Sequence, residues 1–184
     1  MQLTDTYYRK QSYLAQVDQN DAIIGQVERW DAHKKGLLHR GFTTVLTYRG
    51  QILMQHRKHP AFDKYWDLSF SSHQIYEDNV LQSDAKAIIN TLQREWNLNE
   101  SDLESAPQFL GKVYYQAKDP KSIFIEHEHD YIYLAALKRL PLSNSDFSYG
   151  FKIIGQISEV TQTKDALAPW VETILKEIDF NKIK

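Results

Sequence analysis

The spacing of apolar residues along this chain predicts many short strands and only two long helices. Residues 42–48 and 51–57 form a predicted hairpin, because apolar side chains line both segments and Arg49-Gly50 supplies a tight turn between them. Helical spacing of apolar residues occurs at 84–96 and again at 166–180. A chain dominated by strands, with helices at two separated places, indicates an α+β fold in which the helices pack against a mixed sheet.

Further strands are predicted at 22–29, 66–72, 109–117, 123–137 and 151–158. The first 20 residues have no predicted structure, although the tyrosines at positions 7, 8 and 13 favour packing over a loose tail. No internal repeat, low-complexity tract or linker divides the 184 residues. We therefore expect a single domain over residues 1–184.

Composition excludes several classes of protein. Lys and Arg number 22 against 24 Asp and Glu, so there is no basic excess to bind nucleic acid or an anionic membrane. No apolar run reaches the roughly 18 residues that cross a bilayer, and the N-terminus lacks the apolar stretch of a signal peptide, so we expect a cytoplasmic protein. Cysteine is absent, which removes disulfides, thiolate metal ligands and thiol nucleophiles.

Histidine and glutamate supply the candidate metal ligands. His33 and His39 flank a short loop before the hairpin, and His73 ends a predicted strand. Glu126 and Glu128 lie two residues apart in another predicted strand, so their carboxylates share one face. Three imidazoles and two carboxylates would together suit Zn²⁺ or Mn²⁺ and leave a coordination position open. The alternatives are a solvated acidic strand end and isolated surface histidines.

Four more residues have a functional and a structural interpretation. Glu95 lies inside the predicted helix at 84–96, where a surface ion pair is the alternative. Trp170 follows Pro169 at the start of the last helix, where core packing is the alternative. Arg29 and Arg57, at the ends of predicted strands, are candidate substrate-binding residues because guanidinium groups bind phosphate, or else ordinary exposed arginines.

A series of short motifs follows in a fixed order along most of the chain. They are Trp30-Asp31-Ala32-His33, Leu38-His39-Arg40-Gly41-Phe42, Ile52-Leu53-Met54-Gln55-His56-Arg57, Ser69-Phe70-Ser71-Ser72-His73, Arg94-Glu95-Trp96-Asn97-Leu98, Val113-Tyr114-Tyr115-Gln116-Ala117, Glu126-His127-Glu128-His129-Asp130-Tyr131-Ile132 and Ala168-Pro169-Trp170. With these motifs the sequence resembles the type 1 isopentenyl-diphosphate isomerases of the Nudix superfamily over about residues 20–178. The resemblance implies a Nudix-type α/β/α sandwich with a mixed central β-sheet.

The resemblance also implies two kinds of metal site. The matches to the five ligands of the family's tightly held metal, Zn²⁺ or Mn²⁺ here, are His33, His39, His73, Glu126 and Glu128. Glu95 matches the glutamate that binds the Mg²⁺ arriving with the diphosphate. The implied partner is a small diphosphate substrate; the oligomeric state is left open.

The implied reaction is a metal-dependent 1,3-allylic proton shift that interconverts isopentenyl and dimethylallyl diphosphate. Glu128 matches the catalytic glutamate and Tyr115 the tyrosine beside it. Trp170 matches the tryptophan whose ring faces the cationic intermediate. Ser71 stands where the family has a catalytic cysteine, and a serine hydroxyl is far less acidic than a thiol of pKa about 8.5.

Two further departures from the family pattern keep other functions open. Asp67-Leu68 replaces a Thr-Asn pair, and Thr91 stands where a basic residue is usual. Because Trp66-Asp67-Leu68-Ser69 is closer to the hydrolase relatives, metal-dependent hydrolysis of another diphosphate is one alternative. The second half of the hydrolase motif, however, keeps only Glu95 among its glutamates, which indicates impaired hydrolysis. An inactive diphosphate-binding homologue is the other alternative.

Overall fold

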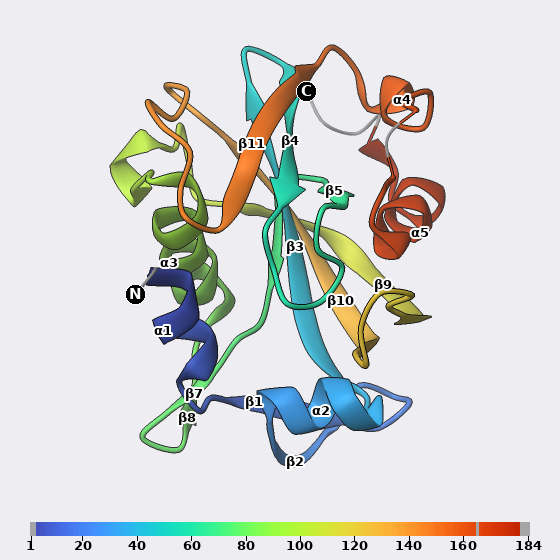
Figure 1. Ribbon diagram of the computed structural model, residues 1–184. Coiled ribbons are helices and arrows are strands. Elements are labelled where there is room, and N and C mark those ends of the chain that lie inside the picture. The colour runs from blue at the N-terminus through green and yellow to red at the C-terminus, as the bar shows by residue number, and fades with distance from the viewer. Residues whose placement is uncertain (1–2, 165, 181–184) are drawn as a thin grey trace.

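A long mixed sheet forms the middle of the molecule, as Figure 1 shows. The computed structural model describes residues 3–164 and 166–180. Its helices are α1 (Leu3–Arg9), α2 (Arg29–Lys35), α3 (Asp84–Trp96), α4 (Ile157–Val160) and α5 (Pro169–Glu177), with a 3₁₀ turn at Glu100–Asp102. Its strands are β1 (Tyr13–Val17), β2 (Ile23–Glu28), β3 (His39–Tyr48), β4 (Gln51–Arg57), β5 (Trp66–Asp67), β6 (Phe70–Ser72), β7 (Tyr76–Glu77), β8 (Val80–Leu81), β9 (Gln108–Lys118), β10 (Ile125–Ala136) and β11 (Ser148–Ile154).

The centre of the sheet is the parallel pair β3 and β10. Strand β10 also pairs antiparallel with β9, while β3 pairs antiparallel with both β4 and β6. In this register Glu128 on β10 lies opposite His39 on β3 and opposite Tyr115 on β9. The pairing of distant segments thus brings candidate site residues together from both halves of the chain.

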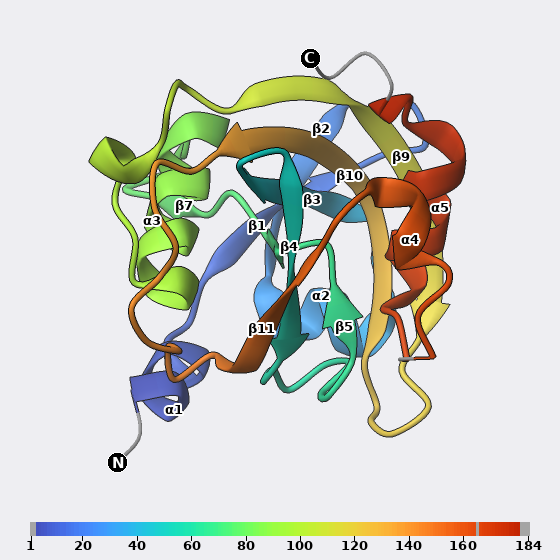
Figure 2. The same cartoon turned by 90° about the horizontal axis from the view of Figure 1, so that it is seen from above.

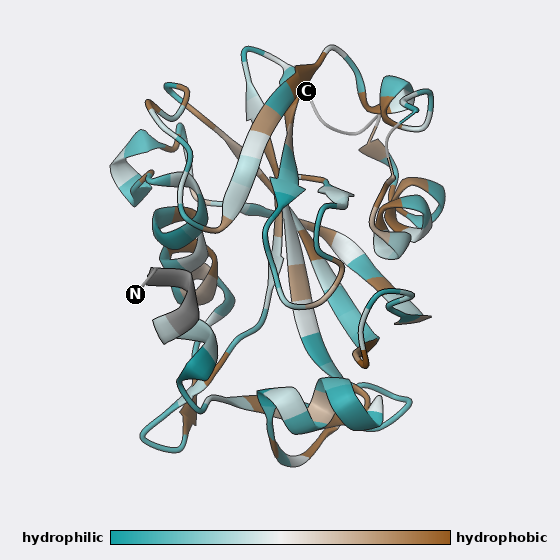
Figure 3. Ribbon diagram, in the orientation of Figure 1, coloured by the Kyte–Doolittle hydropathy of each residue, from teal (hydrophilic) through white to brown (hydrophobic). Residues whose placement is uncertain are grey.

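Helices cover the two faces of this sheet, with α3 on one side and α5 on the other, as Figures 1 and 2 show. One apolar core includes Leu92 of α3 and Phe42 of β3, and the other includes Ile174 of α5 and Val113 of β9. In Figure 3 both helices carry hydrophobic and hydrophilic residues, as helices that bury one face do. The predicted α+β class, with helices on both faces of a mixed central sheet, is confirmed.

The predicted helix at 84–96 is confirmed in full as α3. Ser83 caps its N-terminus by accepting a hydrogen bond from the backbone N–H of Lys86 at 3.3 Å, and Asn97 ends it in the left-handed conformation at φ 53°. The closing helix is shorter than predicted, since α5 spans 169–177 and begins at Pro169, whose missing N–H costs nothing at that position.

Two strand predictions needed correction, and one segment without predicted structure forms regular elements. Strand β11 ends at Ile154, so the predicted strand at 151–158 is wrong over its last part, where α4 begins. The segment predicted as one strand at 66–72 is divided into β5 and β6, because Ser69 takes a φ of 98°. Among the first 20 residues, which had no predicted structure, Leu3–Arg9 form α1 and Tyr13–Val17 form β1.

None of the helices within residues 3–164 and 166–180 combines the length and the hydropathy that crossing a bilayer requires.

Candidate active site

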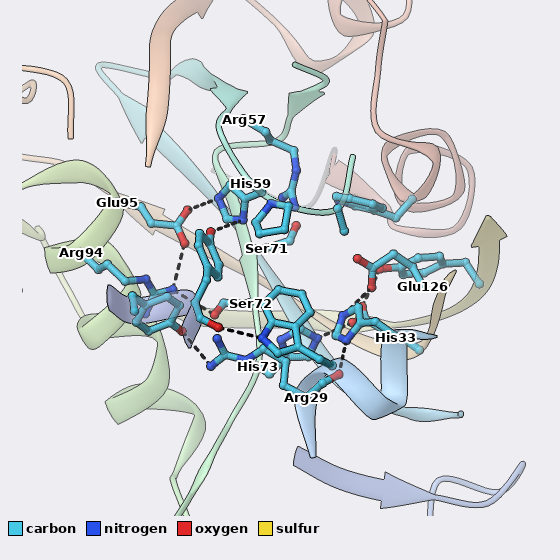
Figure 4. Close-up of a pocket in the computed structure, with 18 residues that line it drawn as sticks. Arg29, His33, Arg57, His59, Ser71, Ser72, His73, Arg94, Glu95 and Glu126 are labelled. Carbon is cyan, nitrogen blue, oxygen red and sulfur yellow. Dashed lines mark hydrogen bonds and ion pairs between the residues drawn. The ribbon is translucent and has the colours of Figure 1, made fainter. Parts of the chain in front are cut away.

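A pocket opens beside the central strands, between α1, α2, α3 and the start of α5 (Figure 4). Nearly all of the predicted site residues line it: Arg29, His33, Arg57, Ser71, His73, Glu95, Tyr115, Glu126, Glu128 and Trp170. His39 lies directly behind it, in contact with His73 and Glu128. The structure therefore brings all of the predicted site residues to one place.

Five of these side chains converge, with one ligand atom from each lying within 4.8 Å of all the others: His33, His39, His73, Glu126 and Glu128. We call this set the histidine–glutamate cluster. His33 comes from α2, which ends at Gly36 in the left-handed conformation at φ 62°, and the turn there directs the chain into β3 at His39. His73 follows β6, and both glutamates lie on one face of β10.

Backbone carbonyls orient two of the three imidazoles. His33 Nδ1 lies 2.7 Å from the carbonyl oxygen of Arg29, and His39 Nδ1 lies 2.7 Å from that of Leu37. Because a carbonyl oxygen only accepts, each Nδ1 donates a proton to it, and each Nε2 is directed toward the cluster. This is the arrangement that commonly fixes the tautomer and ring orientation of a metal-binding histidine.

The remaining contacts are made within the cluster itself. His33 Nε2 lies 3.2 Å from Glu126, His39 Nε2 lies 3.2 Å from Glu128, and His73 Nε2 lies 2.7 Å from Glu128. His39 Nε2 and His73 Nε2 are themselves only 3.2 Å apart. Imidazole nitrogens and carboxylate oxygens gathered this closely form a nitrogen and oxygen donor set that fits Zn²⁺ or Mn²⁺.

Burial and the neighbouring charges separate the protonation states of these groups. Burial alone lowers the pKa of His33, but the Glu126 carboxylate outweighs it and raises that pKa to about 9. Burial lowers the pKa of His73 to about 4, even though Glu128 opposes the shift. Burial disfavours ionised Glu128, yet His73 and His39 hold its pKa well below the ordinary value. Both glutamates are therefore ionised at neutral pH, as metal ligands must be.

Tyr115 lies across the strand pair from Glu128 and donates its phenolic proton to Glu128 Oε2 at 2.5 Å. Burial, followed by the nearby Glu128 charge, raises the pKa of Tyr115 well above its ordinary value. The phenol therefore keeps its proton at neutral pH and holds it against a carboxylate of the histidine–glutamate cluster.

Glu95 is buried rather than exposed, which excludes the alternative of a surface helix carboxylate. It faces the pocket from α3 and lies 2.9 Å from Arg94 and 3.4 Å from His59. Burial opposes ionisation of Glu95, but His59 and then Arg94 lower its pKa to about 2. Glu95 lies outside the histidine–glutamate cluster and presents a separate negative charge to the same pocket.

Ser71 lies at the pocket wall with a chain of hydroxyl and carboxyl groups behind it. Its Oγ lies 2.7 Å from Thr43 Oγ1, which donates to Asp130 Oδ2 at 2.8 Å. Burial and the Glu128 charge raise the pKa of Asp130 well above its ordinary value. The serine hydroxyl is thus held in place by a buried network.

Trp170 and Arg57 make up another wall of the pocket. Both are buried, so Arg57 is not the ordinary exposed arginine that the sequence left as an alternative. The Arg57 guanidinium carbon lies 4.8 Å from the centre of the Trp170 ring. Tyr115 also packs near this ring, at 5.7 Å between ring centres.

The residues that line the pocket without a role predicted from the sequence include Tyr7, Tyr8, His59 and Arg94. Tyr7 accepts a hydrogen bond from Arg29 at 3.1 Å, and Tyr8 bonds His59 at 2.8 Å. The only signal for the tyrosines was their preference for packing in a segment without predicted structure. His59 lies in a loop, where neither periodicity nor a motif marks it.

Solved structures with similar folds identify the fold of this chain. A crystal structure of a Deinococcus radiodurans protein matches with a TM-score of 0.64 at 15% identity, covering 89% of this chain and 98% of that one. The MutT Nudix hydrolase of Burkholderia pseudomallei matches with a TM-score of 0.58 at 17% identity, covering 77% of this chain and 98% of that one. The chain therefore has the Nudix fold.

Among proteins with this fold, the chain is similar in sequence to isopentenyl-diphosphate isomerases. The chain is 29% identical over 177 residues to the isopentenyl-diphosphate Delta-isomerase of Serratia proteamaculans. The aligned region covers 91% of this chain and 92% of the relative. It is 31% identical over 139 residues to the human isopentenyl-diphosphate delta-isomerase 2, covering 68% of this chain and 61% of the relative. No protein-family model matches the chain. The protein is a Nudix-fold homologue of the isopentenyl-diphosphate isomerases, and the resemblance predicted from its sequence is confirmed.

Proposed function

We propose that this protein is an isopentenyl-diphosphate isomerase that shifts a double bond by a 1,3-allylic proton transfer between isopentenyl and dimethylallyl diphosphate. The observation that carries the proposal is the convergence of the histidine–glutamate cluster, Tyr115 and Trp170 on one pocket. The homology to isomerases supports the choice of reaction over hydrolysis. We propose a small diphosphate as the substrate and the cytoplasm as the location.

The histidine–glutamate cluster is proposed to hold one Zn²⁺ or Mn²⁺, and Glu95 a Mg²⁺ that arrives with the diphosphate. Bound there, these ions supply positive charge that keeps the diphosphate fixed and away from the reacting carbons. Arg29 and Arg57 are proposed as the protein's own cationic contacts to the substrate, since both guanidinium groups line the pocket.

The residues of the protein are proposed to transfer protons and to stabilise a carbocation. Adding a proton to C4 of the substrate and removing one from C2 passes through a tertiary carbocation, which needs a surface that stabilises positive charge without attacking it. The face of Trp170 meets that need, because a desolvated cation–π contact contributes about 2 kcal/mol. Tyr115, whose phenol donates a hydrogen bond to Glu128, is proposed as one proton-transfer group. Ser71 is proposed as the second, in the place of the family's cysteine.

One assay tests this proposal. Purified protein is incubated with isopentenyl diphosphate and Mg²⁺, and dimethylallyl diphosphate and free phosphate are measured together. We expect the allylic product without phosphate release. Phosphate released from a panel of nucleoside diphosphates would instead support the hydrolase, and the absence of either product from metal-loaded protein would support an inactive homologue.

A further inference from the structure

Asp67 is completely buried beside the pocket, and each of its carboxylate oxygens has a partner. Oδ1 accepts the indole N–H of Trp170 at 2.9 Å and the backbone N–H of Leu68 at 2.8 Å. Oδ2 accepts from Arg57 Nη1 at 2.7 Å. A single carboxylate therefore fixes both the indole and the guanidinium, each through a hydrogen bond, and the bond from the guanidinium is between two charged groups.

This arrangement accounts for the position of Arg57 over the Trp170 ring, 4.8 Å from its centre. The Arg57 side chain is only 5% exposed, and that of Asp67 is 0% exposed. Without this carboxylate the buried guanidinium would lose its hydrogen-bonded counter-charge and would keep only the more distant charges of Glu126 and Glu95, which is unfavourable. Asp67 thus neutralises Arg57 where it lies.

The other two arginines of the pocket differ from each other in this respect, since Arg94 also has a carboxylate partner. Arg94 lies 2.9 Å from Glu95. Arg29 donates to the Tyr7 hydroxyl at 3.1 Å. Within the described residues the Nε of Arg29, like those of Arg57 and Arg94, is buried without a hydrogen-bond acceptor, so the difference lies in the terminal nitrogens. Of the two arginines proposed to face the substrate, Arg57 therefore shares its charge with a carboxylate, whereas Arg29 donates to the hydroxyl of Tyr7.

We propose that Asp67 is a positioning residue that holds Arg57 against the Trp170 indole and so withholds part of the Arg57 charge from a bound diphosphate. Arg29 then carries the larger part of the protein's electrostatic contact with that anion. The inference rests on the proposed function in one respect, that the ligand of the pocket is a diphosphate. It assigns to Asp67, at a position where the sequence departs from its family, control over both the ring and the cation.

The first experiment measures the affinity of the metal-loaded protein for inorganic pyrophosphate by calorimetry. We expect Arg29→Met to weaken binding at least tenfold and Arg57→Met to weaken it less than threefold. Asp67→Asn keeps an acceptor for the indole but removes the charge facing Arg57, so binding should tighten at least threefold. The gain should vanish in the double variant with Arg57→Met. A loss at Arg57→Met equal to that at Arg29→Met would overturn the proposal, and this comparison does not depend on Asp67→Asn folding.

A second measurement needs neither turnover nor ligand. In a ¹⁵N–¹H spectrum the indole signal of Trp170 is assigned by its absence from Trp170→Phe, and we expect Asp67→Asn to move that signal upfield. An unmoved signal would contradict the role of Asp67 in orienting the ring.

Steady-state turnover of isopentenyl diphosphate separates this proposal from the proposed function. Asp67→Asn should lower both KM and kcat, since the anion is held more tightly while the indole is less well placed. A folded Asp67→Asn protein with unchanged KM and kcat would count against the positioning role. Wild-type protein without isomerase turnover would contradict the proposed function, while the pyrophosphate and spectral measurements would still decide the role of Asp67.

Discussion

The two ends of the pocket differ in how the charges of their side chains are balanced. At one end the histidine–glutamate cluster brings two ionised carboxylates together with three imidazoles, and His33 is the imidazole whose pKa is raised to about 9. At the other end, which we call the indole end, Asp67 and Arg57 neutralise each other beside Trp170. The first end has the donor set of a cation site, whereas the second already contains its own cation.

This difference indicates which end tolerates change. A site that depends on an added cation loses its function when one ligand is removed, because affinity depends on ligand number and geometry. The Asp67–Arg57 pair needs no added ion, so a variant of either group leaves the residues of the histidine–glutamate cluster in place. We therefore expect variants of the cluster to abolish activity, and variants of the indole end and of the wall between the ends to change its magnitude.

The largest effect should follow from removing a cluster carboxylate. Glu126→Gln and Glu128→Gln should each reduce bound metal to a small fraction of the wild-type content. Turnover should fall at least about 1,000-fold, which corresponds to roughly 4 kcal/mol. Elemental analysis and the isomerase assay check this. His127→Gln is the matched control, because its side chain lies between the two glutamates on β10 but points to the other face. Full metal content in both glutamine variants would remove the contrast between the ends.

The next effect concerns pH and should appear only at the cluster. With its pKa raised to about 9, His33 is protonated at neutral pH in the metal-free protein, and a metal must displace that proton. Affinity for Zn²⁺ should therefore rise by roughly tenfold per pH unit up to about pH 9 and then level off. The stability that the His33–Glu126 pair gives the metal-free protein is present below about pH 6.5 and is lost as pH rises through about 9. Zinc titrations at several pH values test this, and His33→Asn should flatten the profile.

Ser71, on the wall between the two ends, should give a gain rather than a loss. A thiol ionises far more readily than an alcohol, so Ser71→Cys should raise isomerase turnover about tenfold or more if proton transfer is limited by this group. Ser71→Ala is the control and should lower turnover. An unchanged rate in Ser71→Cys would indicate that position 71 does not face the substrate. Because the chain has no other cysteine, any change in thiol reactivity is assigned without ambiguity.

The smallest effect should come from the residue behind Ser71. Thr43→Val removes the hydroxyl that links Ser71 to Asp130, and within the described residues Asp130 Oδ1 already has no partner. A buried acceptor that loses its partner costs about 2 kcal/mol, or roughly 4–8 °C in Tm for a chain of this size. Thermal unfolding measures it, with Thr43→Ser as the variant that keeps the bond. Metal content should not change, and a loss of metal would connect this wall to the cluster.

Much of the fold was predictable because local patterns determine it. Apolar residues at helical spacing predicted the bounds of α3, and the strands predicted at 109–117 and 123–137 correspond to β9 and β10. The division of the segment at 66–72 was not predictable, since Ser69 has a positive φ that its residue type does not favour. Its hydroxyl bonds to the backbone of Leu46 and Leu53, contacts that exist only in the folded sheet.

The candidate site was predictable to the extent that motifs name its residues. Spacing placed Glu126 and Glu128 on one face, but the approach of Glu128 to His39 depends on the parallel pairing of β3 and β10, which no local pattern determines. Tyr8 and His59 were missed for the same reason, because a residue of α1 and a residue of a loop meet only through the tertiary fold. The role of Asp67 likewise emerges only from its contacts with Arg57 and Trp170.

Because the metal ligands meet only in the native register of β3 against β10, metal binding reports when these two strands pair during folding. A slip by one residue would turn Glu128 away from His39, so the ligand set exists only after two remote stretches have aligned in the correct frame. Such long-range alignment is among the late and slow events of chain collapse. Stopped-flow refolding in the presence of a chromogenic zinc indicator would therefore measure the rate at which the two halves of the polypeptide pair through β3 and β10.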